Sequence, residues 1–261
     1  MCRWSAWIGD PIFLKTLIYD PEHSLVDQSQ AAEECKAAIN ADGFGVAWYD
    51  ALPEPGLYRD VFPAWSDPNL RSITEQISAR IFLAHVRAST GTATSRNNCH
   101  PFRAGKWAFM HNGQVGGFEG FRREADMAIP AKLYPHRLGA TDSEVLFLLA
   151  LAENLAADPN RAVARATERL EENSRRQGCG PHMRMSAAFS DGTSLYAVRY
   201  ASDNKAPSLY YRQSEAGFAV VSEPYDAESG WTKVAQGQFC RFTKTSVTLE
   251  PFELPSLVCA P

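Results

Sequence analysis

Cys2 directly follows the initiator methionine, so removal of Met1 would make it the first residue of the mature chain. That residue would carry a thiol nucleophile and a free α-amine, whose ordinary pKa of about 7.7–8.0 suits a general base. Cysteine is small enough for methionine removal, whereas a retained Met1 would tie the amine up in a peptide bond. Taken alone, Cys2 is more simply explained as an ordinary second residue, so the rest of the chain must supply its partners.

Three further polar positions stand where a strand or a helix is expected to begin or end. A strand over 81–87 ends on Arg87, whose planar guanidinium can bind a carboxylate through two parallel hydrogen bonds. Asn112-Gly113 is most simply a hairpin turn, and alternatively supplies two donors to a developing oxyanion. Asp142, at the start of an expected helix, either favours the positive helix end or binds a cationic ligand group.

The composition is that of an ordinary globular protein. The 261 residues are 45% hydrophobic and 21% charged, with a formal net charge of −4, which gives no reason to expect nucleic-acid binding. The sequence contains no apolar run near the roughly 18 residues that a membrane helix needs, and no signal-peptide pattern. With no repeat, linker or low-complexity tract, residues 1–261 are expected to form a single domain.

The six cysteines contain no C-x-x-C pair, and their spacing suits neither a zinc site nor a compact disulfide framework. Such cysteine usage is typical of a reduced, cytoplasmic protein.

The elements expected in the first half of the chain are strands over 3–8, 44–49, 81–87 and 106–110 and a helix over 28–39. The proline-rich stretch 51–70 is expected to be a loop, and a capping box from Ser72 to Glu75 predicts a short helix from Ile73. Gly45, inside a strand, is either structural or a sign that some other group approaches the backbone closely there.

In the second half, residues 116–140 are expected to be rich in loops. A second capping box, of Thr141 and Glu144, predicts a buried helix over the following apolar run. Asp158-Pro159 predicts another helix to about residue 175. Strand pairs are then expected within 185–200, 209–222 and 237–249. Helices in the middle of the chain with antiparallel strands on both sides indicate an α+β fold with large antiparallel sheets.

In this order, Met1-Cys2, His85-Val86-Arg87, His111-Asn112-Gly113 and Thr141-Asp142-Ser143-Glu144 resemble the class II glutamine amidotransferases, a family of N-terminal-nucleophile (Ntn) hydrolases. The likeness is strongest to stand-alone members, among them YafJ-like proteins and the γ-glutamyl amide hydrolase of ergothioneine biosynthesis. Residues 40–49, 98–102 (Asn-Cys-His-Pro-Phe) and 221–224 (Val-Ser-Glu-Pro) extend it over roughly 2–250. The resemblance implies a four-layer αββα sandwich of two antiparallel sheets.

The resemblance also implies roles for the polar positions. Cys2 looks like the nucleophile that attacks the side-chain amide of glutamine, with its own α-amine as base. Arg87 is similar to the arginine that grips the substrate α-carboxylate, and Asp142 to the partner of the α-ammonium. Asn112 and Gly113 look like the oxyanion hole. Release of ammonia and hydrolysis of a glutamyl thioester would follow, with no metal or cofactor required.

His100 and Ser222 lie in the resembling stretches and are also expected to bind substrate, with Ser89 and Thr90 as further candidates. His85 and His100 could each orient the site or satisfy a buried hydrogen bond. The structural role is favoured for His85, and His100 stays open between the two.

Two other functions compete with glutamine hydrolysis. The substrate could be another γ-glutamyl amide, or the chain could be a non-catalytic glutamine-binding subunit, against which the presence of every predicted catalytic group argues. No stretch resembles a fused synthetase domain, so ammonia would pass to solvent or to a separate acceptor enzyme. The sequence leaves open whether the chain forms a homodimer.

Overall fold

The strands form two antiparallel sheets in the computed structural model, which describes residues 2–33, 39–89 and 93–255. The first sheet has seven strands in the order β11 (Thr232–Lys233), β9 (Tyr210–Ser214), β10 (Gly217–Val221), β1 (Arg3–Phe13), β4 (Ser78–Val86), β2 (Phe44–Tyr49) and β3 (Gly56–Asp60).

The second sheet has six strands, in the order β13 (Val247–Pro251), β12 (Gln238–Phe242), β8 (Leu195–Ala201), β7 (Met183–Ser190), β6 (Trp107–Val115) and β5 (Phe102–Ala104). The three C-terminal strand pairs predicted from the sequence are found as β7–β8, β9–β10 and β12–β13.

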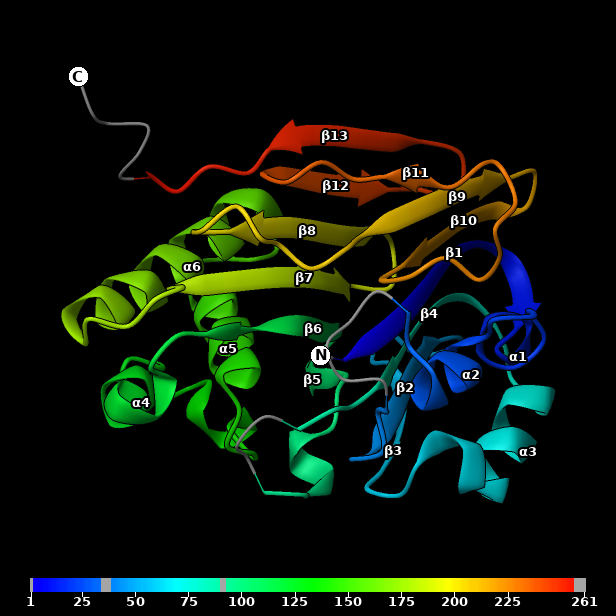
Figure 1. Ribbon diagram of the computed structural model, residues 1–261, viewed down its shortest axis with the longest axis horizontal. Helices are drawn as coiled ribbons and strands as arrows, with labels where there is room; N and C mark the ends of the chain where they lie inside the picture. The colour runs from blue at the N-terminus through cyan, green and yellow to red at the C-terminus, as the bar shows by residue number, and fades with distance from the viewer. Residues whose placement is uncertain (1, 34–38, 90–92, 256–261) are drawn as a thin grey trace.

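Helices cover the outer face of each sheet. The helices α1 (Lys15–Ile18), α2 (Leu25–Gln30) and α3 (Pro68–Gln76) pack on the first sheet, and α4 (Phe118–Met127), α5 (Asp142–Ala152) and α6 (Pro159–Arg176) pack on the second (Figure 1). A third apolar core, which includes Trp4, Leu83 and Met110, fills the space between the sheets. The predicted four-layer αββα sandwich is therefore confirmed. None of the helices in the described ranges is long and apolar enough to cross a membrane.

Strand β1 lies in the interior of its sheet, between β10 and β4. Its side chains alternate, so Trp4, Ala6 and Ile8 enter the core between the sheets while Trp7 packs toward α1 and α2. The strand is longer than the predicted 3–8, because a bulge between Ile8 and Ile12 carries the pairing with β4 past Pro11. Cys2, two residues before Trp4, lies on the same face of the sheet as Trp4.

Helix α5 begins as predicted, because the Thr141 hydroxyl accepts a hydrogen bond of 3.2 Å from the amide of Glu144. The reciprocal half of the capping box is absent. The Glu144 carboxylate instead binds Arg137 and the amides of Leu138 and Gly139. The apolar residues 145–150 of α5 are buried on every side of the helix, as the sequence indicated. Helix α6 also begins as predicted, at a cap of Asp158 followed by Pro159.

Two predicted helix boundaries are wrong. A capping box of Ser24 and Asp27 starts α2 at Leu25, and the helix ends at Gln30 instead of covering 28–39, of which residues 34–38 lie outside the described ranges. Helix α3 starts at Pro68 after the cap of Asp67, so Ser72 lies inside it. In both cases an earlier capping residue prevails over the predicted start.

Two predicted loops contain regular structure. The stretch 51–70 includes β3, which pairs with β2 because its prolines fall outside the paired residues. Residues 116–140 include α4, which follows the left-handed Gly117 and buries Phe118, Phe121 and Ala125 on one face. Asn112-Gly113 does not form the hairpin turn, because β6 continues straight through it to Val115, paired with β7 throughout.

Candidate active site

Cys2 lies at the junction of β1 and β4. Arg3 pairs with Val86 across these strands, which places Cys2 beside Arg87. The Cys2 thiol contacts the main chain of Ala88, whose amide donates to Sγ at 3.4 Å and whose oxygen accepts from it at 3.5 Å. Burial raises the pKa of this thiol, whereas the hydrogen bond from Ala88 and the charge of Arg87 lower it. The thiol therefore needs a base or a nearby cation to ionise near neutral pH.

The turn before β2 holds Arg87 in place. The buried guanidinium of Arg87 donates to the oxygen of Asp42 at 3.2 Å and to the hydroxyl of Ser89 at 3.1 Å. The Asp42 carboxylate in turn accepts from the amide of Ser89 at 2.6 Å. These contacts fix the side chain in one direction, which is what a carboxylate-binding arginine requires.

Asn112 and Gly113 lie side by side on β6. Ala108 and Met110 of this strand point into the core between the sheets. Asn112 is an even number of residues from both, so its side chain points toward the same core, as that of Cys2 does from the other sheet. Asn112 is fully buried, and neither polar atom of its side chain has a hydrogen-bond partner among the described residues. A buried amide without a partner is uncommon in a stable fold, and this one remains available for a ligand.

Asp142 is fixed at the N-terminus of α5. One carboxylate oxygen accepts from the amide of Val115 at 2.7 Å, and the other accepts from the amide of Ser143 at 2.7 Å. A carboxylate has about four lone-pair sites, so this one retains capacity for a cationic group. Asp142 begins the helix, which is the first of the two roles that the sequence left open, and because it also lines a cavity, the binding of a cationic group stays a prediction.

His111, to which the sequence analysis gave no role, connects these parts. Its Nε2 lies 3.2 Å from the oxygen of Arg184 and its Nδ1 lies 2.8 Å from the hydroxyl of Ser143. Burial lowers the pKa of His111, and the Asp142 carboxylate counteracts this effect. The hydroxyl of Ser143, which lies against Nδ1, donates to the Asp142 carboxylate at 3.2 Å. A Cβ at Gly113 would overlap the Arg184 oxygen and the His111 ring, which explains the glycine. The position of His111 directly before Asn112-Gly113 was the available signal.

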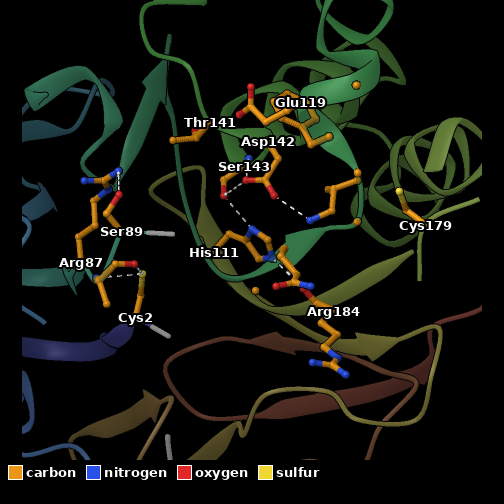
Figure 2. A pocket seen from close by; sticks show the side chains of 18 of the residues that line it. Cys2, Arg87, Ser89, His111, Glu119, Thr141, Asp142, Ser143, Cys179 and Arg184 are labelled. Atoms are coloured by element: carbon orange, nitrogen blue, oxygen red, sulfur yellow. Dashed lines mark hydrogen bonds between the residues drawn. The ribbon is translucent and has the colours of Figure 1, made fainter. Parts of the chain in front are cut away.

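Cys2, Arg87, His111, Gly113 and Asp142 line one cavity of about 500 Å³, whereas the buried side chain of Asn112 does not belong to its lining. Figure 2 shows Cys2, Arg87 and Ser89 at one end of it, Cys179 at the other, and His111 and Asp142 between them. The end that lies beyond Asp142 is formed by the turn into α4 and the segment after α6. Its lining residues are Gly116, Gly117, Phe118, Glu119, Gly120, Gln177 and Cys179.

His100, a buried histidine, lines this cavity, and a second buried histidine, His85, packs against His100. The rings of His85 and His100 stand 4.3 Å apart between centroids, and His100 also contacts Phe102. No ring nitrogen of either has a hydrogen-bond partner among the described residues. Burial lowers the pKa of His85 to about 3 and that of His100 well below its usual value, so both rings are neutral. His100 lines the cavity, as expected of a substrate-binding residue, and a Cβ at Gly45 would overlap its carbonyl oxygen.

Ser222, like Asn112, is not among the residues that line the cavity. Its hydroxyl accepts from the amide of Trp4 at 2.9 Å and donates to the Trp4 oxygen at 3.2 Å. Its hydroxyl thus holds the start of β1, and contact with a substrate stays a prediction. Met1 and Thr90 lie outside the described residues. Within the described ranges, no three His, Cys, Asp or Glu side chains gather closely enough to hold a metal ion.

Comparisons with known proteins agree with this arrangement. The family described as "Glutamine amidotransferases class-II" matches residues 23–219. A probable glutamine amidotransferase of Saccharomyces cerevisiae is 30% identical over 96% of this chain and 84% of its own. The γ-glutamyl-hercynylcysteine sulfoxide hydrolase of Mycobacterium tuberculosis is 29% identical over 95% of this chain and 96% of its own.

Solved structures extend the likeness. A glutamine aminotransferase class-II domain protein of Silicibacter pomeroyi has a TM-score of 0.79 and 50% identity, and the match covers 97% of this chain and 100% of that one. The glutamine phosphoribosylpyrophosphate amidotransferase of Bacillus subtilis has a TM-score of 0.64 at 14% identity, covering 97% of this chain and 49% of that one, and shares the fold.

Proposed function

The chain belongs to the class II glutamine amidotransferases, and we propose that it hydrolyses a γ-glutamyl amide, glutamine in the simplest case, with Cys2 as its nucleophile. The observation that carries this proposal is the convergence on one cavity of the thiol of Cys2, the guanidinium of Arg87 and the carboxylate of Asp142. One end of this cavity offers a nucleophile, and two opposite charges lie within reach of it.

The reaction begins once Met1 is removed and the α-amine of Cys2 is free. The amine takes the thiol proton, and the thiolate attacks the amide carbon of the substrate. The side-chain amide of Asn112, which has no partner among the described residues, and the amide of Gly113 donate to the tetrahedral oxyanion. One such donor is typically worth about 2.7–4 kcal/mol. The C–N bond then breaks, the leaving amine takes the proton, and water hydrolyses the thioester to glutamate.

Arg87 and Asp142 bind the α-carboxylate and α-ammonium end of the substrate. The α-carboxylate pairs with the guanidinium of Arg87, and the α-ammonium pairs with the carboxylate of Asp142, so a zwitterion is held by two opposite charges. The neutral ring of His100 lies on the cavity wall as a further contact.

The intact mass of the purified protein, with and without 6-diazo-5-oxo-norleucine, tests the proposal. This reagent is an electrophilic glutamine mimic. The expected product is one methionine lighter than the full chain and carries one adduct, which peptide mapping places on Cys2. A processed chain that stays unlabelled and does not turn over any γ-glutamyl amide would overturn the proposal. Glutamine binding without turnover would instead support a non-catalytic binding subunit.

A second candidate substrate is a γ-glutamyl amide that carries a substituent on its nitrogen. The mycobacterial relative is named as a hydrolase of such a compound. The ratio of kcat/KM for glutamine and for γ-glutamyl-cysteine compounds distinguishes the two candidates.

The setting of the reaction is also a proposal. We place the enzyme in the reducing cytoplasm, because the cysteines in the described ranges (Cys2, Cys99, Cys179 and Cys240) are free thiols. Residues 1–261 act as one domain, and ammonia passes to solvent or to a separate acceptor enzyme. Sedimentation of the purified chain decides between a monomer and a homodimer.

A further inference from the structure

Arg3, the neighbour of Cys2, is a buried cation outside the cavity. Its parity along β1 is opposite to that of Trp4, so its side chain leaves the sheet on the side of α2. Arg3 Nε lies 2.6 Å from a carboxylate oxygen of Glu223, and both side chains are almost fully buried. A second guanidinium nitrogen, Nη1, donates to the main-chain oxygen of Cys2 at 3.3 Å. The side chain of Arg3 therefore holds the main chain of the proposed nucleophile.

Glu223 connects this contact to two other segments. Its second carboxylate oxygen lies 2.8 Å from Nε2 of His23, whose side chain is 24% exposed. Its main-chain oxygen accepts from the side chain of Gln28, on α2, at 3.3 Å. Glu223 also directly follows Ser222, which binds the main chain of Trp4. Ser222 and Glu223, which follow β10, thus bind Trp4 and Arg3, respectively, at the start of β1.

A buried ion pair is a poor device for stability alone, because the desolvation of two charges offsets most of their attraction. The start of a chain, in contrast, is held from one side only and tends to fray. Once Met1 is removed, Cys2 becomes such a start, and its thiol must keep its place against Ala88 and near Gly113. A misplacement of about 1 Å at a reacting group costs on the order of 100-fold in rate.

We infer that Arg3, Glu223 and His23 form a positioning clamp that fixes the main chain of Cys2, so that the free amine and the thiol keep their reactive geometry. None of the three lines the cavity. The clamp therefore acts through Cys2, whereas Arg87 and Asp142 bind the substrate. This inference rests on the proposed role of Cys2 as nucleophile.

Glu223→Gln and Arg3→Lys test the clamp in processed protein. Both keep the approximate size of the side chain, and each loses part of the bridge between Glu223 and Cys2. We expect kcat to fall by about tenfold or more while KM stays within about twofold, because an effect on geometry alone leaves ground-state binding intact. Asp226→Asn is the matched control, since it removes the carboxylate that pairs with Arg212 at 2.9 Å, outside the cavity. Its kcat should equal that of the wild type.

A second readout does not depend on turnover. The rate of alkylation of Cys2 by iodoacetamide, followed by peptide mass, should fall in both clamp variants, while that of the free thiol of Cys179 should not. A wild type that turns over no γ-glutamyl amide would overturn the proposed function, and the alkylation rates would still decide on the clamp. Wild-type kcat and wild-type Cys2 alkylation in both variants would overturn the clamp. If Glu223→Gln does not fold, His23→Ala removes the partly exposed partner of Glu223 and should lower both kcat and the alkylation rate to a smaller degree.

Discussion

The indole Nε1 of Trp4 donates a hydrogen bond of 3.1 Å to the main-chain oxygen of Ser186. Trp4 stands two residues after Cys2 on β1, and Ser186 is the residue on β7 that pairs with Asn112 on β6. A single buried contact across the core between the sheets therefore connects the strand of the nucleophile to the strand of the proposed oxyanion hole. The distance between these two parts depends on how the sheets pack, not on a loop.

Replacement of Cys2 by alanine should abolish turnover and leave the fold and glutamine binding intact. The Cys2 side chain makes only weak contacts with Ala88, so the loss in free energy of unfolding should stay below about 1 kcal/mol. Thermal unfolding, titration calorimetry with glutamine and an activity assay check the three parts. An unfolded variant would mean that Cys2 is a packing residue.

Arg87→Lys should raise KM by about tenfold or more, equivalent to about 1.4 kcal/mol, because an ammonium cannot form two parallel bonds to a carboxylate. The value of kcat should change little. Arg59→Lys is the matched control, since Arg59 binds the oxygen of Cys99 at 2.9 Å and does not line the cavity. An unchanged KM in Arg87→Lys would refute the carboxylate assignment.

Asn112→Leu should separate activity from stability. The Asn112 side chain is buried and has no hydrogen-bond partner among the described residues, so an apolar side chain of similar size breaks no bond and relieves the desolvation of the amide. We expect an unchanged or higher Tm with a loss in kcat on the order of 100- to 1000-fold. A large fall in Tm would indicate a structural role for the amide.

The buried histidines should make the protein less stable in acid. The pKa of His85 falls from 6.5 to about 3 on folding because burial disfavours the charged ring. Between these values the unfolded chain binds the proton and the folded chain does not, so stability is full above pH 6.5 and falls as the pH drops toward 3.

Thermal unfolding between pH 7 and pH 4 checks this prediction with two variants. His85→Phe should flatten the decline in Tm on acidification, because the group that gains a proton on unfolding is gone. His136→Phe, at an exposed position, should decline as the wild type does. Equal declines in all three proteins would show that His85 does not contribute.

The α+β class with large antiparallel sheets could be predicted because it depends on patterns that are local in the sequence, whereas the four αββα layers followed from the family resemblance. The three C-terminal strand pairs and the caps of Thr141 and Asp158 are each contained in a few residues. The start of α3 and the presence of α4 were missed for a related reason. Proline at Pro68 and a glycine-rich stretch before Phe118 indicate loops equally well until packing decides.

The parts of the site that depend on contacts distant in the sequence could not be predicted from it. Cys2, Arg87 and Asp142 were found because each stands at the end of an element and matches a family pattern. The bond between His111 and Ser143, and the unpartnered amide of Asn112, depend on how β6 packs against α5 and β1. The bonds between the Ser222 hydroxyl and the main chain of Trp4 likewise depend on how β10 pairs with β1.

If Cys2, which lies directly before an interior strand and lines the cavity, is the nucleophile proposed above, the initiator methionine has the role of a propeptide. On the proposed mechanism the newly made chain is a zymogen, and methionine aminopeptidase is its activator. Any extension fused ahead of Cys2 would act as an inhibitor that is covalently attached, because it occupies the amine that must serve as base. Activity would then measure the maturation of the chain as well as its folding.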